Sequence, residues 1–272
     1  MSPYTEQQFL FAGTSPAAQQ IASEAWQRVR AHYSETGDPT TDAAAELYLP
    51  YHNTAHQLNV AHDIRLLRDI VGLTPYEYEV ALNAGFTHDV YQELDAPSGT
   101  NELISAEWLS QRMEAHSDTY SPMQVTYGRL AIAGTICVAP AKHLMIEQRA
   151  TQQEYPNRRA EMIAHVVAAA DLGRLFTPDG PYLSHRLFQE RQTGGSGQVP
   201  KMDDVLEFQK SQIDLVSGGY YYPSQIIQRA MEHGRGRIIA YSKKLLKDLE
   251  TGRVETWEQL LEQDKAFAKS LS

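Results

Sequence analysis

Four short clusters carry most of the side chains that could do chemistry, and they lie far apart along the chain. They occupy residues 51–56, 86–91, 101–106 and 169–172. Together they supply imidazole and carboxylate groups, the ligands that suit Mn, Fe, Co, Ni or Zn. The chain has ten histidines but a single cysteine, which excludes a thiolate cluster and an internal disulfide. The clusters therefore predict a metal site built from histidine and aspartate.

The first cluster contains His52 and His56, four residues apart. A helix predicted over 53–71 has apolar residues at a spacing of three or four, and His56 shares their inward face. If the helix begins by His52, both histidines face the same way. If Asn53 is the cap, His52 lies just before the helix and leans over its N-terminus. The alternative for His56 is a core histidine that bonds a backbone carbonyl.

The second and fourth clusters supply the carboxylates. His88 and Asp89 close an apolar helix predicted to begin at Pro75, where helical phasing breaks down and both side chains can reach one cation. Asp171 ends an alanine-rich helix predicted over 158–170. A buried, unpaired aspartate is costly, and a divalent ion offsets that cost. Alone, Asp171 would be a surface cap; with the other clusters it completes a set of two histidines and two aspartates.

A second histidine–aspartate pair, His62-Asp63, provides an internal comparison. It lies in the middle of the helix predicted over 53–71, where adjacent side chains diverge by ~100°. We interpret His62 as a surface residue. Asp63 lies near the face of His56, and we interpret it as a residue that supports the site or forms a salt bridge.

The order of these residues on a helical chain resembles the HD superfamily of metal-dependent phosphohydrolases. The opening motif of cyclic-nucleotide phosphodiesterases is similar to Tyr51-His52-Asn53 followed by His56 and Val60. A resemblance to a bacterial subfamily of predicted HD phosphohydrolases rests on Asn101-Glu102, Ser105-Ala106, Thr135, His143 and Ala170-Asp171-Leu172. The similar stretch covers residues 51–190.

The resemblance implies a role for each matching residue. The implied ligands of a divalent transition metal ion (Mn, Fe, Co, Ni or Zn, with Mg conceivable in a second site) are His56, His88, Asp89 and Asp171. His52 is implied as the proton donor or phosphate-binding histidine beside the metal, and Asp89 suits the orientation of the attacking water. Glu102 would hold a further water, or else is a surface glutamate. Asn101 and His143 would contact the substrate or a second metal.

The expected activity is hydrolysis of a phosphate mono- or diester, small and nucleotide-like, by a metal-activated water. The chain departs from known patterns, because it lacks the paired histidines and Gly-Tyr-Pro run of cyclic-di-GMP enzymes. Gln92 also stands where nucleotidase-type relatives place an acidic residue. The identity of the substrate is therefore not inherited. Two alternatives stay open: a catalytically inactive regulatory module that binds nucleotide or metal, and a di-iron oxygenase, which would need more histidine ligands.

Helical periodicity dominates the rest of the chain and predicts an all-α fold with a single domain over 1–272. The HD-like core is expected over about 45–192, and a helical extension over 198–272. The glycine-rich run at 194–197 is predicted to be a mobile loop between helices. A helix expected over 224–249 contains two glycines, which would weaken and kink it.

The amino-acid composition indicates which kinds of binding partner to expect. The chain has 24 basic and 34 acidic residues, a formal net charge of −10. A cationic face for a nucleic-acid polymer or an anionic membrane is not expected, and no run approaches the ~18 apolar residues of a membrane span. The N-terminal sequence does not resemble a signal peptide, so a cytoplasmic location is expected. A small phosphorylated substrate remains compatible, because a metal supplies local positive charge. The sequence carries no signal for an oligomeric state.

Overall fold

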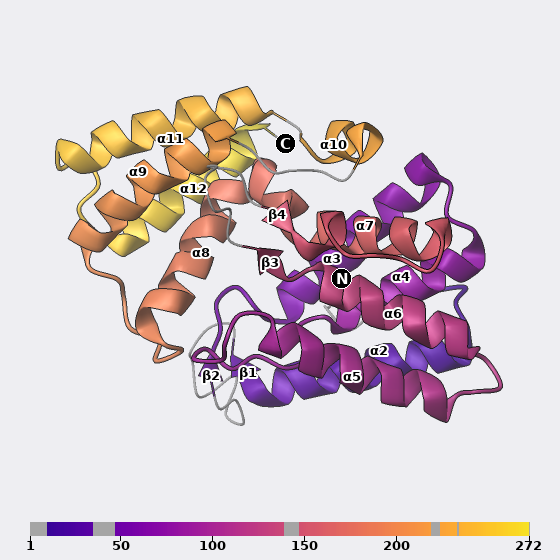
Figure 1. Cartoon of the computed structure of the whole chain (residues 1–272). Coiled ribbons are helices and arrows are strands. Elements are labelled where there is room, and N and C mark those ends of the chain that lie inside the picture. Colours follow the sequence, from indigo (N-terminus) through magenta and orange to yellow (C-terminus); the bar gives the residue numbers. More distant parts are fainter. Residues whose placement is uncertain (1–9, 35–46, 139–146, 219–223, 233, 272) are drawn as a thin grey trace.

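The computed structural model describes residues 10–34, 47–138, 147–218, 224–232 and 234–271. This part of the chain is almost entirely helical, which confirms the predicted all-α class (Figure 1). The helices are α2 (Pro16–His32), α3 (Thr54–Val71), α4 (Pro75–Thr87), α5 (Thr100–Ala115), α6 (Pro122–Gly134), α7 (Arg158–Gly173), α8 (Gly180–Thr193), α9 (Met202–Gly218), α10 (Gln225–Met231), α11 (Arg235–Glu250) and α12 (Trp257–Leu271). Two short 3-10 turns are η1 (Arg149–Thr151) and η2 (Arg174–Phe176).

Two minimal sheets connect the helices. The strands β1 (Tyr33–Ser34) and β2 (Leu47–Tyr48) pair in parallel, and β3 (Cys137–Val138) pairs antiparallel with β4 (Glu147–Gln148). The β2 strand is also bonded to the glycine-rich run, because the Tyr48 amide donates to the Gly195 carbonyl at 3.0 Å. The run predicted as a mobile loop therefore lies against β2.

Local signals explain where the site helices begin. The side chain of Asn53 accepts hydrogen bonds from the amides of Ala55 and His56, so Asn53 is the N-cap of α3. His52 consequently lies just outside the helix. At α4, the cap Thr74 and Glu77 form a capping box ahead of the apolar segment. Of the two starts that the sequence left open for α3, the structure has the one with Asn53 as the cap.

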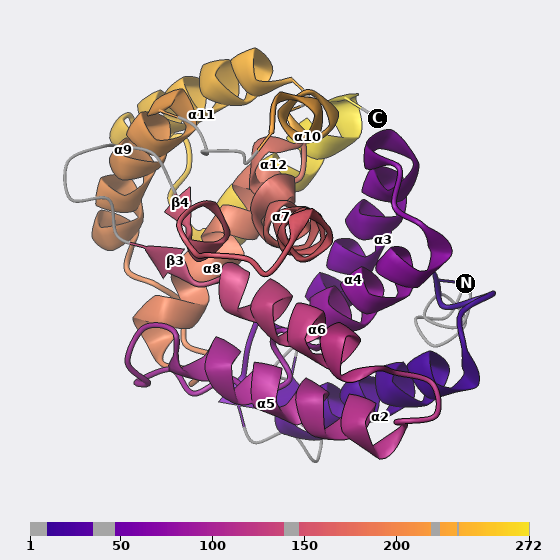
Figure 2. The same ribbon diagram turned by 45° about the vertical axis from the view of Figure 1, so that its right-hand side comes forward.

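Two hydrophobic clusters stabilise the bundle. The larger one draws on helices α2 to α7 and also on α10, whose Ile227 and Met231 are buried in it. The smaller one joins Phe188 of α8 to apolar residues of α9, α11 and α12 or next to them. Figures 1 and 2 show these last three helices grouped at one end of the molecule, with α8 beside them. The larger cluster surrounds the helices that carry the candidate site.

The C-terminal region differs from the prediction at one place. The segment expected as one helix over 224–249 forms two helices, α10 and α11. Gly234 adopts φ +79° at the start of α11, a left-handed conformation that residues other than glycine rarely take. The break lets α10 pack against α3 and α7 while α11 packs against α9. Within the described residues, no helix is both long and apolar enough to span a membrane.

Candidate metal centre

Three helices bring the predicted ligands together. His56 lies in the first turn of α3, His88 caps the C-terminus of α4, and Asp171 lies in the last turn of α7. The Nε2 atoms of His56 and His88 are 3.3 Å apart. Asp171 Oδ1 lies 3.3 Å from the first of these nitrogens and 3.2 Å from the second. Segments more than a hundred residues apart in sequence thus converge on one point.

Asp89 adds a second carboxylate to the pair of imidazoles. Its Oδ2 atom lies 2.9 Å from His88 Nε2 and 3.2 Å from His56 Nε2. Within the described part of the chain, His56, His88 and Asp171 form the group whose ligand atoms all lie within 4.8 Å of one another. Asp89 does not belong to that mutual group, but it contacts both of its histidines. Each carboxylate therefore faces the same two nitrogens.

This donor set fits a divalent transition metal ion. Imidazole and carboxylate ligands bind such ions at about 2.0–2.2 Å, so neighbouring ligands at right angles stand about 3 Å apart, close to the separations seen here. Asp89 Oδ2 is buried, and among the described residues it faces the two imidazole nitrogens without a regular hydrogen bond, which is costly without a cation. His88 donates its Nδ1 proton to the Gly85 carbonyl at 2.7 Å, which leaves Nε2 free to ligate in the neutral ring. The residues present fit a metal ion.

Neighbouring amides hold both carboxylates in place. Gln92 donates to Asp89 Oδ1 at 2.6 Å, and Asn101 donates to the Gln92 side-chain oxygen at 3.1 Å. Gln148 donates to Asp171 Oδ2 at 2.9 Å. Each amide occupies one carboxylate oxygen and leaves the other to face the imidazoles. Asn101, which the sequence analysis assigned to the substrate or a second metal, therefore does not contact the candidate ligands directly. It bonds Gln92, and Gln92 bonds Asp89.

The charges of His88, Asp89 and Asp171 shift the pKa values of one another. Burial raises the pKa of Asp89, but His88, His52 and His56 together outweigh burial and hold this pKa well below its usual range. The pKa of Asp171 is also lowered, because His88 and His56 together outweigh the effect of burial. Burial lowers the pKa of His88, but Asp89 and Asp171 raise it well above its usual value. A proton on His88 can therefore occupy the site when no ion is bound, and a metal must displace it.

His52 lies beside this group and is held by Glu190 of α8. Glu190 Oε2 accepts from the amides of Tyr51 at 3.0 Å and His52 at 3.1 Å, and its Oε1 bonds the Nδ1 of His52. Burial lowers the pKa of His52, but Glu190 and Asp89 raise it more, to about 9. The ring thus carries a proton at neutral pH, next to His56 at a centroid distance of 5.8 Å.

The remaining predicted residues have different outcomes. Glu102 is half-buried at the start of α5, where burial raises its pKa and the charges of Asp89 and Asp171 add to the rise. The charges of the site therefore act on Glu102, although Glu102 forms no hydrogen bond to a candidate ligand among the described residues. His143 lies outside the described residues. Asp63 forms the expected salt bridge, with its Oδ2 3.2 Å from Arg174 Nε.

Sequence reasoning missed two side chains that hold the site. Glu190 is separated from His52 by 138 residues, and Gln148 from Asp171 by 23. Neither belongs to a motif, and both positions look like polar residues of a surface segment.

Searches for similar proteins return nothing: no family model, no curated protein and no solved structure matches this chain. The chemistry of the site is therefore argued from its own residues.

Proposed function

We propose that this protein is a divalent-metal-dependent hydrolase of small phosphate mono- or diesters, of the HD type. The observation that carries the proposal is the convergence of four potential ligands, His56, His88, Asp89 and Asp171, from helices distant in sequence. One of their oxygens, Asp89 Oδ2, is buried and faces the two imidazole nitrogens without a regular hydrogen bond among the described residues. Two neutral imidazoles and two carboxylates suit a hard or borderline cation with coordination positions left for water and phosphate.

The ion, when bound, lowers the pKa of a coordinated water towards ~7 and polarises a phosphoryl oxygen. The protein supplies orientation. Gln92 fixes one oxygen of Asp89, and Gln148 fixes one oxygen of Asp171, so neither carboxylate turns away from the site. We assign to the half-buried Glu102, on which the charges of Asp89 and Asp171 act, a hydrogen bond to a water near the ligands.

His52 is assigned as the proton donor to the leaving oxygen. Its Nδ1 is bonded to Glu190, which keeps the ring in one orientation and protonated at neutral pH. The side chain is 20% exposed, against 2% for His88, so it is reachable from solvent. A leaving alkoxide needs a proton, and a positioned imidazolium supplies one.

Arg191 is assigned as the cation that receives the phosphate. It follows Glu190 on α8, it is exposed, and its charge acts on His52. Arg174 is instead engaged by Asp63, and Arg186 by Gln189. In a chain of net charge −10, an anionic substrate approaching carboxylates needs such a group.

The test is hydrolysis of an aryl phosphate monoester and an aryl phosphodiester by the full chain with Mn²⁺ or Co²⁺. We expect metal-dependent turnover that falls about 100-fold or more in Asp89→Asn, because a ligand and its charge are altered. Asp63→Asn is the matched control: this aspartate is also buried, on the helix that carries His56, but it pairs with Arg174. It should keep the wild-type rate.

Three outcomes would contradict the proposal. Turnover that survives Asp89→Asn would show that the chemistry occurs elsewhere. Stoichiometric metal with nucleotide binding but no hydrolysis of any ester would identify a binding module. Two irons per chain with visible absorption would identify an oxygenase.

A further inference from the structure

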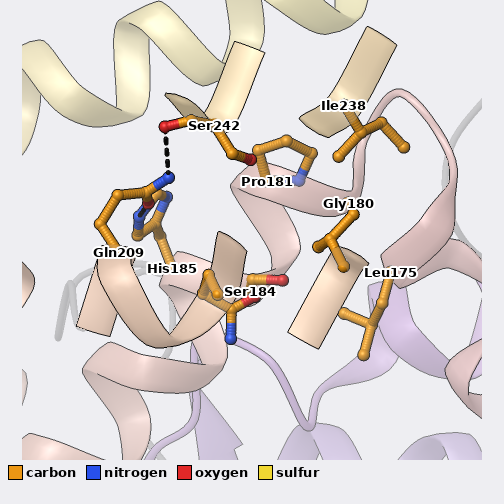
Figure 3. A pocket seen from close by; sticks show the side chains of 10 residues that line it. Leu175, Gly180, Pro181, Ser184, His185, Gln209, Ile238 and Ser242 are labelled. Atoms are coloured by element: carbon orange, nitrogen blue, oxygen red, sulfur yellow. Dashed lines mark hydrogen bonds between the residues drawn. The ribbon is translucent and has the colours of Figure 1, made fainter. Parts of the chain in front are cut away.

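A second polar cluster lies between the C-terminal helices, away from the metal centre. His185 and Asp264 are almost fully buried, at 1% and 0% exposure, and His185 Nδ1 bonds Asp264 Oδ2 at 2.7 Å. Tyr241 donates to the other carboxylate oxygen at 2.8 Å. On the far side of the ring, His185 Nε2 bonds the Gln209 side-chain oxygen at 3.1 Å, while the Gln209 amide donates to the Ser242 carbonyl (Figure 3).

This cluster is not a ligand site. Both ring nitrogens of His185 are engaged by oxygen atoms, so neither is left for a metal ion. The cavity beside it, lined by Ser184 and Pro181 among others, has a volume of about 10 Å³, room for one water molecule at most (Figure 3). Its polar groups bond one another, and the reason for burying them must be structural.

The cluster ties four helices together. His185 belongs to α8, Gln209 to α9, Tyr241 and Ser242 to α11, and Asp264 to α12. The smaller hydrophobic cluster surrounds it, and Phe188 of α8 stacks on Phe208 of α9 with ring centroids 4.2 Å apart. The helices α9 and α12 thus hold α8 through two hydrogen bonds of His185 and one aromatic stack, and α11 holds Asp264 and Gln209 in turn.

Helix α8 also carries Glu190, which belongs to the candidate active site. Glu190 lies five residues after His185 and two after Phe188 on α8. Its buried carboxylate holds the amides of Tyr51 and His52 as well as the His52 ring. A shift of α8 along or about its axis would move this carboxylate away from all three partners.

We propose that the C-terminal helices α9, α11 and α12 position His52: the bond from Asp264 to His185 holds α8 so that Glu190 reaches His52. Asp264 and His185 are positioning residues, since they touch neither the metal ligands nor a substrate. The assignment gives a role to the C-terminal helices, and its kinetic consequence rests on the proposed hydrolase function.

Amide hydrogen exchange tests the proposal without any assumption about activity. In Asp264→Asn, the Tyr51 and His52 amides should exchange about tenfold faster or more, because their acceptor Glu190 is released. The Ala55 and His56 amides, which bond Asn53, should not change. Asp248→Asn is the control variant, because Asp248 is a buried aspartate of α11 that pairs with Lys244 and Arg253 instead of α8.

Kinetics with metal-saturated full chain provide the second readout. Asp264→Asn should lower kcat about tenfold with metal content and KM unchanged, and Asp248→Asn should not. The double variant Asp264→Asn/Glu190→Gln should be no slower than Glu190→Gln alone, because both changes act through one bond. If Asp264→Asn does not fold, Tyr241→Phe provides a milder loss at the same carboxylate.

Unchanged exchange at Tyr51 and His52 in Asp264→Asn would overturn the proposal, as would additive losses in the double variant. A wild-type chain without phosphatase activity would refute the proposed function but would leave the exchange result to decide the positioning role.

Discussion

At the scale of single residues, Glu190 is the side chain that links the most separate parts of the site. One carboxylate neutralises the positive charge on His52 and satisfies two backbone amides just before α3. Burial raises the pKa of Glu190, but the charge and hydrogen bonds of His52 and the amide of Tyr51 together outweigh burial and lower this pKa. Removing one partner from such a buried pair leaves the other charge uncompensated.

The stabilisation by this pair should depend on pH in a defined window. The pKa of Glu190 is lowered from its ordinary value of 4.5. Its contribution to the free energy of unfolding is therefore present above pH 4.5 and is lost as the pH falls below that value. Because the pKa of His52 is raised from 6.5 to about 9, its contribution is complete below 6.5 and is lost as the pH rises through 9. Glu190→Gln should therefore cost about 2–3 kcal/mol between about pH 5 and 6.5, and less outside this range.

Denaturant unfolding of both proteins with chelator, from pH 3 to 10, measures this difference. A free-energy difference that does not vary with pH would contradict the ion pair.

Arg191 should determine how tightly the substrate binds. Arg191→Gln is expected to raise KM for an aryl phosphate about tenfold with a smaller change in kcat, since it removes a charge-assisted contact to phosphate. Arg237→Gln, an exposed arginine on α11, is the charge-matched control. Steady-state kinetics at low and high salt check the result, and equal KM values in the two variants would refute the assignment.

The spacing of residues predicted that His56, His88, Asp89 and Asp171 would lie together, but it did not predict the residues that support them. His56, His88, Asp89 and Asp171 share helix faces or helix ends with apolar residues, and that pattern is local and readable. Glu190 supports His52 only because α8 returns to the start of α3, which is a tertiary event. No local pattern distinguishes such a glutamate from a solvated one.

At the scale of the elements, the close approach of α3 and α4 sets the distance between the two histidines. Gly85 lies on α4 where a Cβ atom would stand 2.2 Å from Ile64 Cδ1 and 3.0 Å from Val60 Cγ1. The carbonyl of the same glycine receives the Nδ1 proton of His88. The absence of a side chain therefore permits the helix contact, and the backbone of the same residue orients the His88 ring.

Gly85→Ala should destabilise the protein by about 1–3 kcal/mol and weaken metal binding, because the added methyl group pushes α4 and His88 away from α3. Gly236→Ala is the matched control, since a Cβ on this helical glycine of α11 meets no atom within 4 Å. It should leave stability unchanged or raise it by about 0.5–1 kcal/mol. Thermal unfolding and metal titration of both variants provide the test, and equal metal affinities would refute the role of Gly85.

The helices themselves were largely predictable, because caps and apolar spacing are local. The boundary between α10 and α11 was not, because two glycines mark a weak point without saying whether a helix bends or ends there. Packing of α10 against α3 and α7 decides in favour of a break.

At the scale of the whole molecule, the bundle consists of one large hydrophobic cluster and a smaller one that α8 joins. The larger cluster extends beyond residues 45–192, because α2 and α10 contribute buried side chains to it. The C-terminal helices contain no motif, so their relation to the site became visible only through α8. The molecule is acidic, and its buried carboxylates and imidazoles lie close together. A bound cation would offset this buried negative charge.

The most direct test of that centre is anomalous diffraction from crystals of the full chain grown with Mn²⁺ or Zn²⁺. We expect a single strong peak about 2.0–2.3 Å from the Nε2 atoms of His56 and His88, with carboxylate oxygens of Asp89 and Asp171 at similar distances. A saturating metal concentration that leaves no peak between these four side chains, or places the ion elsewhere, would contradict the account.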